Sequence, residues 1–455
     1  VLKELFQLSL YSTYSTEQRA TALSSEVQKR VKYLSPYLQV QRSATEDEAL
    51  GFLELLGVEC KCAFEGPYSC SSMATLQDIM HLCKHPSVLL TLGGDDRLVL
   101  TDGRRNKYLS TPFVSALEVQ RGSCTCSSLS SRGFAAAAAG LQAFLQAVGR
   151  TGLSAQQALH EHDESVRRGL SELLGLEEKA LEVLLFPSGT DAEFLPLAVA
   201  LVRSRHLCRQ QSTHLDGANA SSADAGEEAR VLSVVYAAGE VGSGTALASG
   251  GRHFSPLCPD AAPAVSGSPL EGLARGAMVE VLQIAPRDPS SGLMRAHDQS
   301  DLRARLEQDP CLVCVVHVVA GSKTGLLLPR IDAFSELQDS FPQRVLLVVD
   351  ACQLRCRVQA LQKCAARGAC VLFTGSKFFG APPFCGAAVL SKVDAALLEA
   401  YLEEQGRGGE DSTAADGLLP VQGLARFLGS AELPACMPRL RARLEHWQLK
   451  LRGAE

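Results

Sequence analysis

From about residue 165 onward, short apolar runs alternate with segments of helical periodicity. Helical periods lie between the runs, as in Asp191–Arg205 and Leu302–Gln308. Continuous apolar strands separated by helices predict an α/β fold, in which a mostly parallel sheet is covered by helices on both faces. The apolar runs are Ala180–Leu185, Val231–Ala237, Val279–Ile284, Leu312–Val319, Val345–Val349 and Cys370–Phe373.

The rest of the chain has a different pattern and suggests four parts. We expect a helical N-terminal region over 1–92, a connecting segment over 93–164, a large domain over 165–400 and a partial C-terminal domain over 401–455. The connecting segment contains a short alternating strand and an alanine-rich helix, and the large domain is interrupted by two polar or proline-rich loops. These four segments are Arg97–Leu100, Phe134–Val148, Gln210–Glu228 and Ser255–Pro269.

Composition restricts the class of protein. The 455 residues are 46% hydrophobic and 21% charged, as expected of a folded globular chain. The net charge of −6 gives no basic footprint for nucleic acid, and no apolar run is long enough to predict a membrane span. Several of the sixteen cysteines lie inside apolar strands, which favours a reducing compartment. We therefore expect a cytoplasmic protein, with an organelle as the alternative.

The first candidate for chemistry is the turn Ser188–Gly189–Thr190, between an apolar strand and a helix. Free backbone N–H groups at a helix N-terminus, two hydroxyls and the positive end of the helix dipole suit a phosphate ester. The alternative is an ordinary helix cap, because Ser and Thr are common there without any ligand.

The second candidate is Asp350, with Gln353 three residues later. Asp350 ends the apolar run Val345–Val349. An acid at the carboxyl end of a parallel strand lies where α/β sheets bind ligands. The alternative is an Asp that caps the next helix, with a solvated Gln.

The third candidate is Lys377, in the small-residue turn Thr374–Gly375–Ser376–Lys377. Removal of its amine from water would lower the pKa and make it a better nucleophile. Ser376, and less directly Thr374, could donate to a phosphate. The alternative is a surface lysine in a turn.

An acid that can hold a ring nitrogen protonated, followed by an amine that can form a Schiff base, suits pyridoxal 5'-phosphate. The order of the motifs resembles that of fold-type I pyridoxal-phosphate enzymes, in particular the class V aminotransferase and cysteine desulfurase group. The most specific resemblance is the stretch after Lys377, Gly-Ala-Pro-Pro-Phe-Cys-Gly. The resemblance as a whole covers roughly residues 165–400.

The resemblance implies a homodimeric enzyme that acts on an amino acid through a Schiff base on Lys377, by aminotransferase, lyase or decarboxylase chemistry. Asp350 would pair with the ring nitrogen, Gln353 would approach the phenolic oxygen, and Ser188, Gly189, Thr190, Thr374 and Ser376 would hold the phosphate. A ring normally stacks on the cofactor, and His253 and then His317 are the candidates. For His317, a satisfied core histidine is the alternative.

The chain departs from the family in three places. Ser322, Lys323 and Thr324 stand where the family often has an Asn near the cofactor. The C-terminal part is short, and Arg426 is the candidate there for the substrate-carboxylate arginine, with Arg439 and Arg441 as equal alternatives. Cysteine desulfurase chemistry is disfavoured, because neither Cys385 nor Cys436 lies in a loop of the family's kind.

Other residues and functions stay open. Asn106, Tyr108 and the stretch Ser123–Ser128 are candidate substrate contacts, or an ordinary polar loop. Cys60, Cys62, Cys70 and Cys83 lack paired zinc knuckles, and strand alternation sends Cys311 and Cys314 to opposite faces, so we predict no metal site. The alternative to an enzyme is a non-catalytic binding or scaffold subunit of the same fold, and a zinc-dependent regulatory module is a weaker third.

Overall fold

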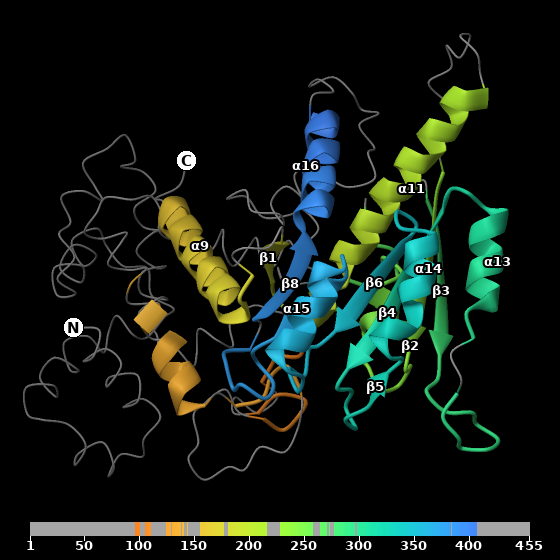
Figure 1. Ribbon diagram of the computed structural model, residues 1–455. Helices are drawn as coiled ribbons and strands as arrows, with labels where there is room; N and C mark the ends of the chain where they lie inside the picture. Colours follow the sequence, from red (N-terminus) through yellow and green to blue (C-terminus); the bar gives the residue numbers. More distant parts are fainter. Residues whose placement is uncertain are drawn as a thin grey trace, which may run out of the picture.

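The computed structural model describes a core of the chain and parts of the connecting segment (Figure 1). The N-terminal region 1–92, Ser123, Cys436, Arg426, Arg439 and Arg441 lie outside the described residues, as does nearly all of 401–455. The described residues are 96–100, 105–110, 124–128, 130–137, 139–140, 143, 155–176, 181–215, 228–257, 264–270, 273, 277–295, 298–383 and 385–406.

An eight-stranded sheet in the order β1-β8-β7-β6-β4-β2-β3, with β5 beside β4, forms the centre of the described residues. The pairs among β3, β2, β4, β6 and β7 are parallel, whereas β8 runs antiparallel to both β7 and β1. The predicted α/β class with a mostly parallel sheet is therefore confirmed. The strands are β1 Leu181–Phe186, β2 Ala229–Tyr236, β3 Ala277–Ile284, β4 Leu312–Ala320, β5 Leu327–Leu328, β6 Val345–Asp350, β7 Cys370–Thr374 and β8 Gly386–Ser391.

Helices cover both faces of this sheet (Figure 1). One face packs against α10 Gly189–Ala192, α11 Phe194–Leu215, α12 Thr245–Ala248 and α16 Lys392–Gly406. The other packs against α9 Ala155–Leu174, α13 Ser300–Gln308, the 3₁₀ helix η1 Ile331–Phe334, α14 Ser335–Ser340 and α15 Val358–Ala366.

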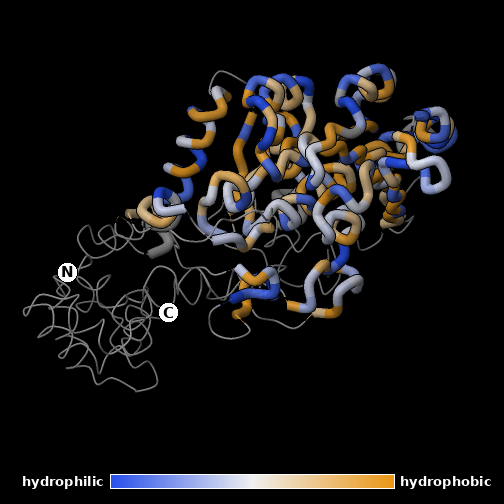
Figure 2. The backbone as a smooth tube through the Cα atoms, turned by 90° about the horizontal axis from the view of Figure 1, so that it is seen from below, coloured by the Kyte–Doolittle hydropathy of each residue, from blue (hydrophilic) through white to orange (hydrophobic). Residues whose placement is uncertain are grey.

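Burial on both faces follows from the uninterrupted apolar strands. Every residue of β6 is buried, and Figure 2 shows hydrophobic stretches gathered in the interior of the described part. Each fully buried Val or Leu stabilises the fold by about 1.5–3 kcal/mol relative to exposure, so these strands are the main source of stability. The first two turns of α11, from Phe194 to Val202, are buried all round, as expected of a helix that is apolar on every side.

The six strands expected in the large domain all form, with boundaries that differ by at most two residues. The strand expected at Arg97–Leu100 does not form, and Leu100 makes only an isolated bridge with Asn106. The sequence prediction missed β8, and it ended α11 too early: the helix continues to Leu215, so residues 210–215 of the expected loop Gln210–Glu228 are helical. The helix expected at Phe134–Val148 begins earlier than predicted, because residues 131–137 are helical. α9 spans the boundary expected at 164/165, and α16 spans the one expected at 400/401.

One ion pair joins the two long helices on the α11 face. Arg203 on α11 donates to Oδ1 of Asp394 on α16 from Nε at 3.0 Å and from a terminal nitrogen at 2.5 Å. Ser391 donates to the other oxygen of Asp394 at 2.8 Å. The Asp394 side chain is only 3% exposed, so its charge depends on these donors.

Replacement of Asp394 by Asn should lower the free energy of unfolding by about 2–4 kcal/mol, because Arg203 would keep a largely buried charge without its partner. Asp332→Asn is the matched control, because its pair with Arg330 is exposed and should contribute about 0–1 kcal/mol. Urea denaturation of both variants measures the difference. Equal losses would contradict the role given to Asp394.

Candidate functional site

The candidate residues gather at one edge of the sheet because the strands share a direction. β1, β4, β6 and β7 all run toward this edge, and the antiparallel strand β8 begins there. The turns that follow these strands contain the residues at Ser188, Ser322, Gln353 and Lys377. Chain segments that are far apart in sequence therefore meet where parallel sheets bind ligands.

Strand alternation also places the polar side chains on one face. Alternate residues of β2, β4, β6 and β7 belong to the apolar cluster under α11. Ser233, His317, Asp350 and Thr374 fall on the same alternation, so their side chains face α11 rather than α14 and α15. The register opposes His317 to Val348 and Val319 to Asp350, so His317 lies two residues deeper than Asp350.

Asp350 and Gln353 are both buried at the end of β6, at 8% and 6% exposure. Oδ1 of Asp350 accepts a hydrogen bond from the backbone N–H of Cys352 at 2.9 Å, which fixes the start of the turn. Oε1 of Gln353 is buried and accepts no hydrogen bond from any described residue. A buried amide oxygen without a donor is costly, and it marks a place where a ligand donor would be stabilising.

The sulfur of Cys352 shows how the charged groups surround this turn. Burial raises the pKa of the Cys352 thiol well above its ordinary value, the Asp350 carboxylate raises it further, and the Lys377 ammonium opposes both. Glu193 also raises it. A carboxylate and an ammonium from successive strands of the sheet thus act on one buried sulfur, which brings Asp350 and Lys377 into one site.

The Ser188 turn forms the expected cap. Ser188 Oγ accepts from the Asp191 backbone N–H at 3.2 Å and donates to the Asp191 carboxylate at 2.5 Å. It also accepts from Arg97 at 3.1 Å. The single hydroxyl proton of Ser188 is thus directed at Asp191 in this structure. Thr190 is half-buried at the same turn.

The Lys377 turn is organised by hydroxyls in the same way. Thr374 Oγ1 donates to the carbonyl of Cys385 at 2.9 Å, and it lies 2.8 Å from the hydroxyl of Ser376. Thr374 has one proton, so Ser376 is the donor in the second bond. Ser376 is fully buried, whereas Lys377 is half-buried.

Two glycines let these turns approach one another. A Cβ added at Gly189 would lie 2.3 Å from Sγ of Cys352, and one added at Gly386 would lie 2.4 Å from the backbone carbon of Ser188. No side chain can be inserted at either position without displacing the turn. The backbones of β1, β6 and β8 therefore fix the relative positions of the Ser188 and Asp350 turns.

His317 lies in a buried polar cluster below the site. Its Nε2 lies 3.0 Å from the Ser233 hydroxyl, and its Nδ1 lies 3.0 Å from Oε2 of Glu193. Burial raises the pKa of the Glu193 carboxyl, and the imidazole partly opposes that rise. Nε2 thus shares a hydrogen bond with Ser233, whereas the contact between Nδ1 and Glu193 has an ion-pair distance without hydrogen-bond geometry.

His253 lies in the loop after α12. Its backbone N–H donates to Ser268, its carbonyl accepts from Gly267, and burial lowers the pKa of its half-buried imidazole. The next residue, Phe254, stacks against Phe194 at the start of α11, with ring centroids 6.1 Å apart. No stacking position follows from these contacts alone.

Sequence reasoning missed Arg97 and Arg355. Arg97 lies over the Phe254 ring at 5.3 Å, and it brings the connecting segment to the Ser188 turn with a guanidinium that is only 12% exposed. Arg355 lies 4.7 Å from the Phe378 ring and donates to the backbone of the Ser322 turn. Neither residue lies in a motif, and only the tertiary structure places them at this edge.

The connecting segment also contains Asn106. Its amide donates to the Cys126 carbonyl at 2.8 Å and accepts from the N–H groups of Tyr108 and Ser110. The amide is therefore occupied in holding a turn, as in the alternative of an ordinary polar loop. Tyr108 is 39% exposed.

Glu240 ties the turn after β2 to the turn after β4. One of its oxygens accepts from the Ser322 hydroxyl at 2.6 Å, the Thr324 hydroxyl at 2.8 Å and the Thr324 N–H at 3.0 Å. These bonds, with that of Ser322 largest, lower the pKa of the Glu240 carboxyl. The residues that stand in place of the expected Asn are thus bound to an acid.

No group of three or more metal-ligating side chains occurs among the described residues. Cys314 is fully buried in the cluster under α13 and α14, and Cys311 contacts α11, so the two face opposite sides as predicted. Within the same part of the chain, no helix has the length and apolar character needed to cross a membrane. The cysteines Cys60, Cys62, Cys70 and Cys83 lie outside it.

No protein-family model and no curated protein matches the sequence. Solved structures are similar in part. Mouse CSAD is 13% identical, with 93% of this chain and 76% of that chain covered and a TM-score of 0.40. The glutamate decarboxylase domain of diaminobutyrate-pyruvate transaminase and L-2,4-diaminobutyrate decarboxylase from Vibrio parahaemolyticus is 11% identical, with 89% and 75% covered and a TM-score of 0.38.

Ureidoglycine-glyoxylate aminotransferase from Bacillus subtilis is 14% identical, with 63% of this chain covered and a TM-score of 0.32. The match spans 56% of the length of that aminotransferase. These likenesses concern fold at low identity. The chemistry of the site rests on the residues of this chain.

Replacement of Gly386 by Ala should lower the free energy of unfolding by about 3 kcal/mol or more, because the new methyl group meets backbone atoms that cannot rotate away. Gly169→Ala in α9 is the control, since nothing lies within 4 Å of its added Cβ. That control should stabilise by about 0.5–1 kcal/mol through helix propensity. Thermal unfolding measures both, and a Gly386→Ala protein as stable as the wild type would refute the close approach.

Replacement of Glu240 by Gln should lower the free energy of unfolding by about 1 kcal/mol at neutral pH. Because the pKa of the folded-state carboxyl is lowered, its contribution is present above about pH 4.3 and is lost as the pH falls through the folded pKa. The difference in the free energy of unfolding between the variant and the wild type should therefore disappear in acid. Denaturation midpoints over a pH series test this, with exposed Glu307→Gln as a control that shows no such gap.

Proposed function

We propose that the chain binds pyridoxal 5'-phosphate at this edge of the sheet and acts on an amino acid through Lys377. The observation that carries the proposal is the placement of Asp350 at the end of β6 and of Lys377 in the turn after its parallel neighbour β7. An anion and an amine at the ends of successive strands are the two groups that this cofactor requires from a protein.

The donors and acceptors at the site fit the cofactor. Asp350 supplies a buried anion for the ring nitrogen, and the unpaired Oε1 of Gln353 can accept from a hydroxyl beside the ring. When bound, pyridoxal phosphate supplies an electrophilic carbonyl and an electron-accepting ring. Lys377 supplies a nucleophilic amine, and the same amine can carry a proton at the substrate carbon.

The phosphate donors that we propose differ from those expected from the sequence. The hydroxyl protons of Ser188 and Ser376 are directed at protein atoms, so both residues hold their turns in shape. The Thr190 hydroxyl, the backbone N–H groups of the Ser188 turn and the nearby Arg97 are then the donors for a phosphate. A guanidinium is well suited to this, because it offers several donors to one anion.

The substrate side is formed by groups beyond Lys377. Phe378 and Phe379 are 53% and 65% exposed beside the amine, and Arg355 lies over the Phe378 ring. Arg355 is a described guanidinium that could take a substrate carboxylate, whereas the arginines that the sequence suggested for this role lie outside the described residues. His253 remains the proposed stacking ring, and a homodimer remains part of the proposal.

A second candidate is a non-catalytic binding subunit of the same architecture. It is favoured by the same hydroxyl bonds. Ser188 bonds within its own turn, and Thr374 and Ser376 bond within theirs, without any ligand. In such a protein, Asp350 and Lys377 would only balance the charge of one another and of nearby groups. It would take up no cofactor.

Purified protein mixed with pyridoxal phosphate should develop a visible absorbance band, and borohydride should fix the cofactor to the peptide that contains Lys377. Lys377→Ala should abolish the band. Replacement of Lys363, an exposed lysine on α15, by Ala should leave it unchanged. Asp350→Asn should weaken cofactor binding by roughly tenfold or more, through loss of a charged hydrogen bond worth about 1.5–3 kcal/mol. A colourless wild-type protein would support the second candidate instead.

A further inference from the structure

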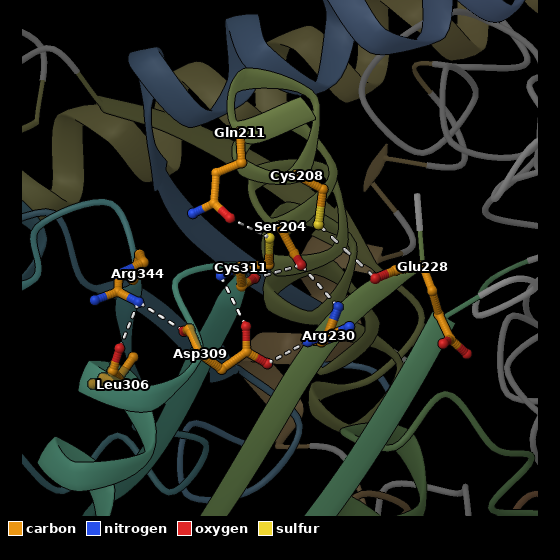
Figure 3. A network of polar contacts seen from close by, with 9 residues as sticks. All are labelled: Ser204, Cys208, Gln211, Glu228, Arg230, Leu306, Asp309, Cys311 and Arg344. Atoms are coloured by element: carbon orange, nitrogen blue, oxygen red, sulfur yellow. Dashed lines mark hydrogen bonds and ion pairs between the residues drawn. The ribbon is translucent and has the colours of Figure 1, made fainter. Parts of the chain in front are cut away.

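One face of α11 meets the start of β4 in a polar cluster far from the site (Figure 3). Ser204, Cys208 and Gln211 recur at helical spacing, so they form one stripe along α11. Cys311 comes just before β4 and lies against this stripe. The strands run from here toward the site, so the cluster lies at the opposite edge of the sheet.

Several hydrogen bonds hold Cys311 against α11. Ser204 Oγ donates to the Cys311 carbonyl at 2.7 Å, and the sulfur of Cys311 lies 3.6 Å from Oε1 of Gln211. Ser204 precedes Cys208 by one turn, and Gln211 follows it by nearly one. Cys311 therefore contacts the residues on both sides of Cys208, and Figure 3 shows the two sulfurs next to one another.

Two further bonds fix the backbone around this pair. The N–H of Cys311 donates to Oδ1 of Asp309 at 3.0 Å, and the N–H of Arg230 on β2 donates to Ser204 Oγ at 2.8 Å. Ser204 is thus bonded to both Cys311 and Arg230, and these bonds hold α11 against the start of β4. The two cysteines therefore lie on chain segments that are held against one another, which is a requirement for a disulfide.

A cation lies beside the two sulfurs. Arg230 pairs with Asp309 at 3.1 Å, and the pKa of Arg230 is raised mainly by that pairing and, to a smaller extent, by Cys311 and Cys208. Both cysteines are half-buried rather than sealed in the core. A nearby guanidinium stabilises a thiolate, which is the species that reacts in thiol exchange.

We propose that Cys208 and Cys311 form a redox-active dithiol, which a small disulfide such as oxidised glutathione converts into a disulfide that joins α11 to the start of β4. One thiolate attacks the oxidant, a mixed disulfide forms and one glutathione leaves. The second sulfur then attacks the mixed disulfide and releases the second glutathione. Two protons leave the protein, and the two electrons end in the two glutathione thiols.

Either sulfur can open the exchange, and the other then lies beside it to complete the disulfide. Burial, and next a hydrogen bond with Cys311, raise the pKa of the Cys208 thiol. Cys314, close in sequence to Cys311, is fully buried on the opposite side of the sheet.

The proposal is tested on the folded protein, oxidised with glutathione disulfide without denaturant, alkylated and then digested with trypsin. Cleavage after arginine and lysine should yield His206–Arg209 joined through a disulfide to Leu306–Lys323. Fragmentation should place the link on Cys311 rather than Cys314, and dithiothreitol should release both peptides. Because the cofactor plays no part, the outcome is independent of the function proposed above.

Three variants make the result decisive. Cys208→Ser and Cys311→Ser should each lose the linked peptide, and Cys208→Ser should trap glutathione on Cys311. Cys356→Ser, which removes another half-buried cysteine, should keep the link at the wild-type yield. The proposal is overturned by a wild-type protein whose Cys208 and Cys311 are both recovered alkylated after oxidation, or are linked only to other cysteines.

Discussion

The burial of the sheet on both faces is the constraint on which the rest of the structure depends. Strands such as β6 lie between two helical layers, so a charge in their middle would be removed from water without compensation. Polar groups are therefore concentrated where the strands end. Because neighbouring strands are parallel, those ends meet along one edge, and the turns that carry Ser188, Asp350 and Lys377 come together there.

A buried cluster among the described residues shows how such a sheet accommodates polarity. Glu193, His317 and Ser233 are nearly inaccessible, and His317 lies 3.0 Å from each of the other two side chains. Burial opposes the charge on Glu193, and the imidazole favours it. The cluster lies directly below Asp350, so it also contributes to the electrostatic environment of the carboxylate that faces the site.

Much of this arrangement could be predicted from the sequence. Apolar runs that end in an Asp or in a small-residue turn identify strands and their functional ends, and these locate Asp350, Gln353 and Lys377. β8 escaped prediction because Gly386 and the alanines after it are small residues without a strong strand signal. α11 was ended too early because its last turns are polar, and polar residues there resemble a loop.

What the sequence could not supply is the direction of hydrogen bonds and the position of distant cations. Ser188 and Ser376 were expected to donate to a ligand, but their protons are committed to Asp191 and Thr374, which are close in sequence yet paired only through the shape of each turn. Arg97 reaches the Ser188 turn from 91 residues away. No local pattern records such a contact.

The position of β8 has a consequence for how the chain is made. Among the described strands β1 pairs only with β8, and Phe186 opposes Gly386, about 200 residues later. At a synthesis rate of about 5–20 residues per second, β1 would leave the ribosome roughly 10–40 s before its partner exists. During that interval neither edge of this apolar strand is paired by a described strand, so the nascent chain exposes a template for wrong strand pairing until β8 is made.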